Sequence, residues 1–158
     1  MVSGPRKIIN LTEMKYMKEV KIALVDTNIL VYAYEATESE RKNNAIKILE
    51  KCYNNEITLA ISNQNLAEFS VVSLKKLKLE ASKIKEIISD ISQFSGFKKI
   101  KYSEKTVISA IDLTKKYTMS FWDALIAATM IENNITNIYT ENEKDFKIPF
   151  LNVINPLS

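Results

Sequence analysis

Four acidic residues stand at positions where they could form a metal site. Asp26 separates two apolar runs in the segment VDTNILVY, and Glu68 lies in NLAEF. Asp123 is the one charged residue of the apolar segment FWDALIAATMI, and Asp145 lies in the polar run ENEKD. Carboxylate oxygens suit hard divalent cations such as Mg²⁺ and Mn²⁺. Together, these acids could hold an ion that activates water for hydrolysis.

Composition excludes most other catalytic chemistries. The 158 residues include no histidine and only two glycines, Gly4 and Gly96. Histidine-based triads, histidine-ligated zinc and imidazole acids or bases are therefore excluded. The isolated glycines also exclude a phosphate-binding P-loop and a GxGxxG dinucleotide turn. Any chemistry must come from carboxylates, amides, hydroxyls and lysines.

Size and hydrophobicity predict a single globular domain. With 46% hydrophobic residues, a chain of this length can bury a full core without disulfides or structural metals. The only cysteine, Cys52, lies in a helical pattern and is interpreted as buried filler in a reducing compartment. No apolar run approaches the roughly 18 to 20 residues of a membrane helix, and residues 1–20 lack the apolar core of a signal peptide. We expect a cytoplasmic protein without membrane association.

Short apolar runs alternate with amphipathic segments, which predicts a β/α framework. Residues 1–20 show no clear hydrophobic period and are interpreted as an N-terminal extension that need not be ordered, and residues 21–158 as the domain. Thr37 and Glu40 are predicted to form a capping box, and Ile108 and Ile111 to be buried. Strands are predicted over 21–26, 57–61, 97–102, 137–140 and 151–156, and helices over 28–34, 39–54, 62–77, 80–94, 103–117 and 120–134.

This framework brings the acids to one edge of a sheet, because ligands of open parallel sheets bind beyond the carboxyl ends of the strands. Asp26 ends the first strand, and the run with Asp145 follows a later strand on the same side. Glu68 and Asp123 lie early in their predicted helices. Two carboxylates about 4 Å apart repel by roughly 4 kcal/mol at an effective dielectric constant near 20. A cluster therefore requires protons or a dication.

Each acid also has a purely structural interpretation. Asp26 could be a turn residue after a strand, and Glu68 an ordinary exposed helix acid. Ser120 and Asp123 form an S-x-x-D pattern typical of a helix cap. Asp145 could be a loop acid. The metal-site hypothesis depends on the coincidence of all four.

Lysines are concentrated in the middle of the chain. Between Lys75 and Lys116 there are eleven lysines against five acids, although the net charge of the chain is only +3. Such asymmetry fits a polyanionic partner, because lysines near phosphates release counterions. The alternative is that these lysines form solvated helix faces.

Four segments resemble PIN-domain ribonucleases of the VapC toxin type, in order and in spacing. They are VDTNILVY, NLAEF, FWDALIAATM and YTENEKDF followed by VINP, and together they span residues 21–156. The resemblance implies a PIN-like, Rossmann-like α/β fold with three α/β/α layers and a mainly parallel central sheet. It also implies an acidic site that holds one or two Mg²⁺ or Mn²⁺ ions.

The resemblance also assigns roles to residues. It implies that Asp26, Glu68 and Asp123 are metal ligands, and that Asn28 and Thr140 support the site through hydrogen bonds. The position two residues after Thr140 is Asn142 rather than aspartate, a variant that the family tolerates. Either Asn142 serves as a ligand there, or Asp145 completes the acidic set directly or through another ligand. These alternatives stay open.

The function that the resemblance implies is a Mg²⁺- or Mn²⁺-dependent endoribonuclease that hydrolyses RNA phosphodiesters. It would be the toxin of a toxin–antitoxin pair, with an antitoxin protein as partner and a homodimeric state. The middle lysines would hold RNA backbone, and Tyr102, Phe121 or Trp122 could stack on unpaired bases. For Phe121 and Trp122 we expect core packing instead.

Three other functions are compatible with the sequence. The chain could be an RNA-processing nuclease without an antitoxin. It could be a catalytically impaired RNA-binding module, with Asn142 as the cause of the loss. It could also be a metal-dependent phosphatase on a related sheet, although that function leaves Glu68 without a role.

Overall fold

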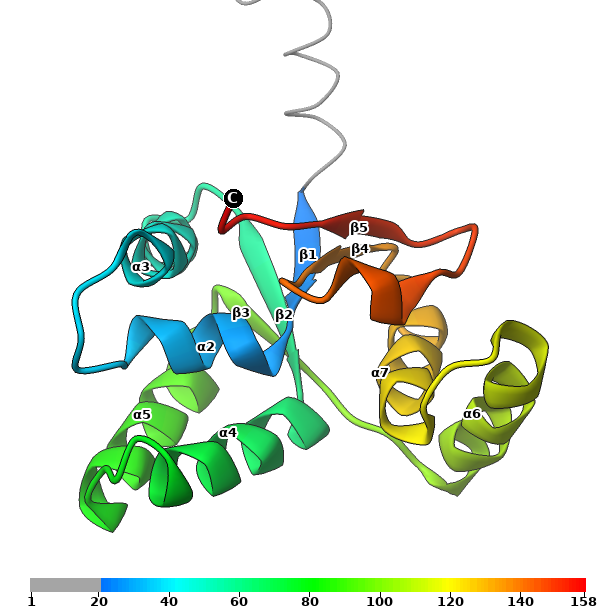
Figure 1. Cartoon of the computed structure of the whole chain (residues 1–158), viewed down its shortest axis with the longest axis horizontal. Helices are drawn as coiled ribbons and strands as arrows, with labels where there is room; N and C mark the ends of the chain where they lie inside the picture. The colour runs from blue at the N-terminus through cyan, green and yellow to red at the C-terminus, as the bar shows by residue number, and fades with distance from the viewer. Residues whose placement is uncertain (1–20) are drawn as a thin grey trace, which may run out of the picture.

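The computed structural model describes residues 21–158, in which helices alternate with short parallel strands (Figure 1). The expected extension over residues 1–20 lies outside the described residues. The strands are β1 Ile22–Val25, β2 Thr58–Ser62, β3 Phe97–Ile100, β4 Asn137–Tyr139 and β5 Asn152–Ile154. The helices are α2 Thr27–Ala33, α3 Glu40–Tyr53, α4 Asn63–Lys75, α5 Ala81–Gln93, α6 Glu104–Tyr117, α7 Phe121–Glu132 and the 3₁₀ helix η1 Glu143–Phe146.

The five strands form one parallel sheet in the order β3-β2-β1-β4-β5. From β1 the chain moves outward through β2 to β3, and then returns to the other side of β1 for β4 and β5. The strand order therefore reverses between β1 and β4, whose carboxyl ends lie side by side. Parallel sheets bind ligands at such a switch point.

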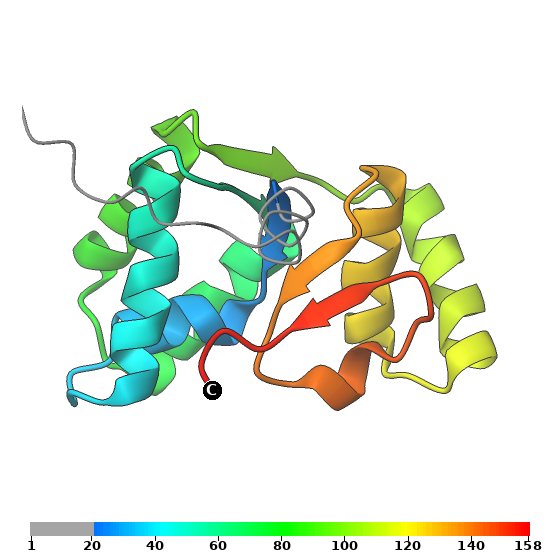
Figure 2. The ribbon, with the colours of Figure 1, turned by 90° about the horizontal axis from the view of Figure 1, so that it is seen from above.

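Helices cover both faces of the sheet, which confirms the predicted three-layer α/β/α fold (Figures 1 and 2). Helices α2 to α5 pack on one face, where the largest apolar cluster includes Ile29, Phe69 and Ile87. Helices α6 and α7 lie on the other face, where Ile126 and Met130 pack against Leu24 of β1. The central strands are buried on both faces, as their continuous apolar runs predict. No helix in the described part of the chain is long and apolar enough to cross a bilayer.

Two local predictions are wrong. The cap of α3 is Ser39, whose hydroxyl accepts a hydrogen bond from Lys42 N at 3.1 Å, rather than a box formed by Thr37 and Glu40. The chain begins the helix two residues after Thr37, at a serine that is followed at the third helical position by Lys42 and so completes no capping box. Burial of Ile108 and Ile111 is also wrong, because their exposed fractions are 62% and 49%.

The packing of α6 against α7 explains the exposure of these isoleucines. Ala110 of α6 packs against Ala124 and Ala128 of α7, and all three are almost fully buried. Small side chains let the two helix backbones approach closely, and Thr106, one turn before Ala110, is also fully buried. This contact turns the face with Ile108 and Ile111 outward. The apolar period of α6 identified a helix but not its buried face.

Candidate functional site

Asp26 joins β1, α2 and β4 at the switch point. It follows the last residue of β1 and caps α2, so that its carboxylate Oδ1 accepts a hydrogen bond from Thr27 N at 2.8 Å. The other oxygen, Oδ2, accepts from the hydroxyl of the fully buried Thr140 at 2.7 Å. The backbone N–H of Asp26 donates to Tyr139 O, 2.9 Å away. The fold thus fixes the position of this carboxylate from three elements.

Glu68 projects from α4 toward the start of α2. Its Oε2 accepts a hydrogen bond from Thr27 Oγ1 at 2.9 Å, and its Oε1 accepts from Gln64 Nε2 at 2.8 Å. Thr27 Oγ1 in turn accepts from Asn65 Nδ2 at 3.2 Å. Asn65 belongs to the capping box of α4 with Ser62. The cap that begins α4 therefore also positions Glu68 beside the residue that follows Asp26.

Asp123 lies in the first turn of α7, a helix that is buried from Ala124 to Met130. Its backbone N–H donates to Ser120 Oγ at 3.2 Å, and the Ser120 hydroxyl donates to Asp123 Oδ2 at 2.7 Å. Asp123 therefore takes part in the cap of α7, as the S-x-x-D pattern predicts. The second carboxylate oxygen, Oδ1, accepts no hydrogen bond from the described residues and so stays available for a ligand.

Asp145 and Asn142 occupy different places after β4. Asp145 lines a hollow of about 310 Å³ together with Asp123. Asn142 has an exposed side chain at the start of η1, and its backbone N–H donates to Thr140 Oγ1 at 3.0 Å. In the described part of the chain, Asn142 is not among the residues that line this hollow. The structure thus brings Asp145, rather than Asn142, next to Asp123.

The four carboxylates influence one another electrostatically. Burial raises the pKa of Asp26 to about 6; the hydrogen bonds from Thr140 and Thr27 N oppose the rise, and the charges of Glu68 and Asp123 add to it. Burial also raises the pKa of Asp123, the Ser120 hydroxyl opposes the rise, and the charges of Asp145 and Glu68 add to it. The negative charge of this site is therefore incompletely compensated by the protein.

The donor atoms of the site fit a hard dication. Every candidate ligand presents oxygen, and a dication would favour the charged form of Asp26, whose pKa is raised chiefly by burial and further by the charges of Glu68 and Asp123. The side-chain oxygen of Asn28, two residues after Asp26, is buried without a hydrogen-bond partner among the described residues. Those residues contain no group of three or more histidines, cysteines or acids already spaced to hold a metal. Joint ligation therefore requires side-chain rotation or intervening water.

Residues 23–150 match the family model of the PIN domain. The chain belongs to the PIN domain family. Solved structures similar to this PIN domain include a chain of a toxin–antitoxin complex from Klebsiella pneumoniae, with 26% identity and a TM-score of 0.62 over 85% of this chain and 97% of that one. Another is VapBC2 from Rickettsia felis bound to a DNA fragment from their promoter, with 27% identity and a TM-score of 0.61 over 85% and 98%.

At 18% identity, the sarcin-ricin loop cleaving toxin VapC20 from Mycobacterium tuberculosis shares the fold, with a TM-score of 0.58 over 82% of this chain and 92% of that chain. No curated protein matches this PIN domain. The resemblance that four short segments indicate is thus supported by the family model and by structures from toxin–antitoxin systems.

The PIN domain also contains site residues that sequence reasoning missed. Thr27 and Gln64 hold the Glu68 carboxylate, and Gln64 Nε2 also donates to Trp122 O at 3.0 Å. Gln64 is four residues before Glu68, a spacing that places both on one helix face and could have indicated the contact. At the rim, Tyr32 OH donates to Glu141 Oε2 at 2.6 Å, a contact between residues far apart in the sequence that no local pattern indicates.

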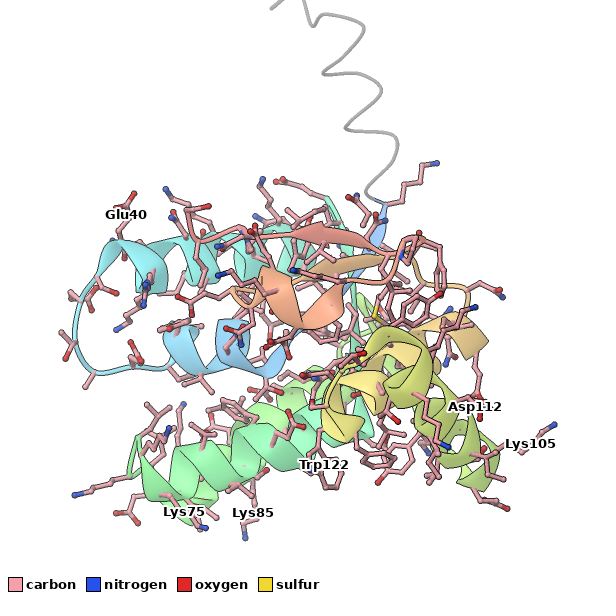
Figure 3. All side chains as sticks on the ribbon, turned by 45° about the vertical axis from the view of Figure 1, so that its right-hand side comes forward. Glu40, Lys75, Lys85, Lys105, Asp112 and Trp122 are labelled. Carbon is pink, nitrogen blue, oxygen red and sulfur yellow. The ribbon has the colours of Figure 1, made fainter. Side chains whose placement is uncertain are left out.

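Two expectations about RNA-contacting side chains change. Core packing of Trp122 is wrong, because 62% of this residue is exposed, and Figure 3 shows its ring pointing outward. Phe121 is half-buried, and its ring meets that of Trp122 edge to face. The lysine-rich block does not form one surface: Lys75 and Lys85 lie at one end of the molecule and Lys105 at the other (Figure 3).

Proposed function

We propose that this PIN domain is a Mg²⁺- or Mn²⁺-dependent endoribonuclease, and that it is the toxin of a toxin–antitoxin pair acting in the cytoplasm. The observation that carries the proposal is the burial of Asp26 among other carboxylates, where its pKa is raised to about 6. Such a group is stabilised by a bound dication. Its position at the switch point of a PIN sheet, and the likeness to chains from toxin–antitoxin complexes, support the same function.

In the proposed site, Asp26, Glu68 and Asp123 hold the ion, with Asp145 or Asn142 completing the set. When bound, the ion supplies the positive charge that activates water and stabilises the charge developing on the scissile phosphate. Thr140 and Thr27 orient Asp26, and Thr27 and Gln64 orient Glu68. Because the chain has no histidine, a site carboxylate or solvent must accept the proton of the attacking water.

The proposed partners are an antitoxin protein and a second copy of the chain. The likeness to a chain of a toxin–antitoxin complex and to VapBC2 supports the antitoxin. Three exposed apolar side chains support the homodimer: Val71 and Leu74 on α4 and Trp122 on α7, with exposed fractions of 50%, 54% and 62%. The bond from Gln64 to Trp122 O joins these two helices. The proposed homodimer would cover this apolar surface.

Metal-dependent cleavage of RNA tests the proposed activity. Wild-type protein is incubated with a structured RNA in Mn²⁺ and, separately, in EDTA. We expect cleavage only with Mn²⁺, and loss of cleavage in Asp26→Asn and Asp123→Asn. Asp112→Asn is the matched control, because Asp112 is an exposed acid on α6 at the far end of the molecule (Figure 3). Cleavage that persists in EDTA, or that Asp112→Asn also removes, would contradict the proposal.

A catalytically impaired RNA-binding module is the second candidate. It is favoured by the neutral Asn142 and by the absence, among the described residues, of an acid cluster already spaced for a metal. The same experiment separates the two functions, because such a module binds RNA tightly but cleaves none with Mn²⁺. An RNA-processing nuclease without an antitoxin would cleave but would have no antitoxin encoded beside its own reading frame. A phosphatase would instead hydrolyse small phosphomonoesters.

A further inference from the structure

The hollow beside Asp123 combines an acidic and a basic wall. It measures about 310 Å³, and its acidic wall consists of Asp123 and Asp145. The loop from Tyr117 to Ser120, which joins α6 to α7, closes one side, and Lys144 and Lys147 supply positive charge. The volume is at the lower end of the roughly 300 to 1,000 Å³ of ligand pockets, which suits one nucleotide unit.

The two lysines have ammonium groups that the protein does not use. Within the described residues, neither Lys144 nor Lys147 forms an ion pair within 4.0 Å, although Asp145 lies between them in the sequence. Both side chains are exposed, whereas the neighbouring Phe146 and Ile148 are 2% and 3% exposed and anchor the segment in the core. The backbone that carries the lysines is therefore fixed, while their charges face solvent and the hollow.

The side of the hollow formed by residues 117–120 has a constrained backbone, and Lys116 lies beside it without lining the hollow. The Lys116 ammonium lies 5.4 Å from the centre of the Tyr117 ring, which lines the hollow. Thr118 has a φ of 50°, in the left-handed region that a non-glycine residue rarely adopts, and it ends α6 there. Met119 packs into the core beside it. The lysines that line the hollow are thus Lys144 and Lys147, while its other side is held by the end of α6 and by core packing.

This distribution of charge fits a substrate with one reacting and one non-reacting phosphate. The carboxylates would repel any phosphate that the dication did not neutralise, and fixed lysines offset that repulsion for a neighbouring phosphate. A lysine ammonium is a compact charge that binds phosphate without reading the base. The hollow therefore offers backbone contact rather than base recognition.

We propose that this hollow is a subsite for the RNA phosphodiester adjacent to the scissile one, with Lys144 and Lys147 contacting its phosphate. The inference rests on the proposed function, because it needs a single-stranded RNA whose scissile bond lies at the carboxylates. With this subsite, the lysine-rich block between Lys75 and Lys116 would not be the only source of RNA-binding charge. Both proposed contact residues lie outside that block.

A second hollow supplies the matched control. It measures about 330 Å³ and is also lined by two lysines and two acids: Lys47, Lys51, Glu50 and Glu56. It lies at the opposite edge of the sheet, since Glu56 precedes β2 and Lys51 O accepts from Ile57 N. A Lys47→Gln/Lys51→Gln variant therefore changes the net charge by the same amount without touching the proposed subsite.

The test compares this control with Lys144→Gln/Lys147→Gln. Cleavage of a single-stranded RNA in Mn²⁺ gives kcat and KM, and fluorescence anisotropy in EDTA, in an Asp26→Asn background, gives the Kd for the same RNA across a salt series. We expect KM and Kd to rise about tenfold in the subsite variant, with kcat within about twofold. The salt slope should become shallower by about 0.7, the value for one phosphate contact on a single strand. The control should match the parent protein.

The outcomes separate the subsite from the proposed function. If the parent protein cleaves RNA and the subsite variant shows the same KM, Kd and salt slope as the control, the subsite is wrong and the nuclease stands. If the parent protein cleaves no RNA, the nuclease is wrong, and so is a subsite beside a scissile bond; weaker binding with the shallower slope in the subsite variant would then keep only the RNA phosphate contact of the two lysines. Equal weakening in both variants would mean that only total charge matters, and it would overturn the subsite.

Discussion

Gln64 and Glu68 are joined by a hydrogen bond of 2.8 Å across one turn of α4, and the same Gln64 amide group donates to the backbone of α7 at Trp122 O. Gln64 is only 5% exposed. Its amide nitrogen thus connects the helix that carries Glu68 with the first turn of the helix that carries Asp123. Two acids from distant parts of the chain are held in relation to each other by one neutral side chain.

Gln64→Leu should weaken metal binding without removing any acid. Leucine keeps the volume but removes the donor to Glu68 Oε1 and to Trp122 O, so that only Thr27 still orients the carboxylate. Loss of a partner that orients a ligand typically costs about 10- to 100-fold in metal affinity or activity. We expect the Mn²⁺ Kd, measured by calorimetry, to rise about tenfold and kcat for RNA cleavage to fall about tenfold.

Gln93→Leu serves as the control for Gln64→Leu, because Gln93 is exposed on α5 and bonds only to Ser89 among the described residues. It should leave both quantities unchanged. If Gln64→Leu binds Mn²⁺ as tightly as the wild-type protein, Glu68 does not need the amide for its place in the site.

The framework and the principal acids could be predicted from sequence because their signals are local. Each central strand is a short apolar run, and Asp26 and Asp123 stand out as single charges within apolar segments. Burying a charge is costly unless the charge is paired or binds a metal. A single acid inside an apolar segment therefore indicates a site before the fold is known. The parallel sheet then follows from the alternation of elements, and it places such residues at one edge.

The residues that orient these acids could not be predicted in the same way, because their contacts are set by packing. Tyr32 meets Glu141 only after β4 has been placed beside β1. Lys144 and Lys147 appear as two lysines in a short polar run until η1 places them around a hollow with Asp123. Ile108 fits an amphipathic pattern, yet the close contact through Ala110 turns it outward.

Thr140→Val should raise the pKa of Asp26 above its value of about 6. The Thr140 hydroxyl donates to Asp26 Oδ2 and so favours the charged carboxylate, and valine keeps the shape without the donor. A hydrogen bond to a charged group contributes about 1.5 to 3 kcal/mol, which corresponds to roughly one to two pKa units. Carboxyl ¹³C NMR titration in EDTA measures the change.

Thr129→Val is the control for this titration, because Thr129 is equally buried but its hydroxyl donates to Leu125 O within α7. It should leave the pKa of Asp26 where it is. A Thr140→Val protein in which Asp26 titrates as in the wild type would show that the hydroxyl does not stabilise the carboxylate.

Asp26→Asn should stabilise the metal-free protein at pH 7 more than at pH 4. The folded-state pKa of Asp26 is raised to about 6, whereas an unfolded aspartate titrates near about 3.9. The folded state therefore holds the proton more tightly, and stability falls as pH rises between these values. The charged carboxylate costs on the order of 2 kcal/mol at pH 7, a cost that asparagine does not carry. Urea unfolding in EDTA at both pH values measures the difference.

Asp112→Asn provides the reference for these unfolding experiments, since an exposed substitution away from the site should change the free energy of unfolding by less than about 0.5 kcal/mol. Equal effects of Asp26→Asn at pH 4 and pH 7 would contradict the prediction. With Mn²⁺ at pH 7, the wild-type protein should instead be more stable than Asp26→Asn, because the ion stabilises only the protein that keeps the carboxylate.

Leu74→Glu should convert the proposed homodimer to a monomer. Leu74 is 54% exposed on α4 and belongs, with Val71 and Trp122, to the exposed apolar side chains of the proposed interface, so a charge there would be buried without a partner in the dimer. Analytical ultracentrifugation at several concentrations measures the loss of the dimer. Ile108→Glu is the matched control, because Ile108 is 62% exposed but lies on α6, on the other face of the sheet. A wild-type protein that sediments as a monomer, or a dimer disrupted only by Ile108→Glu, would place the interface elsewhere.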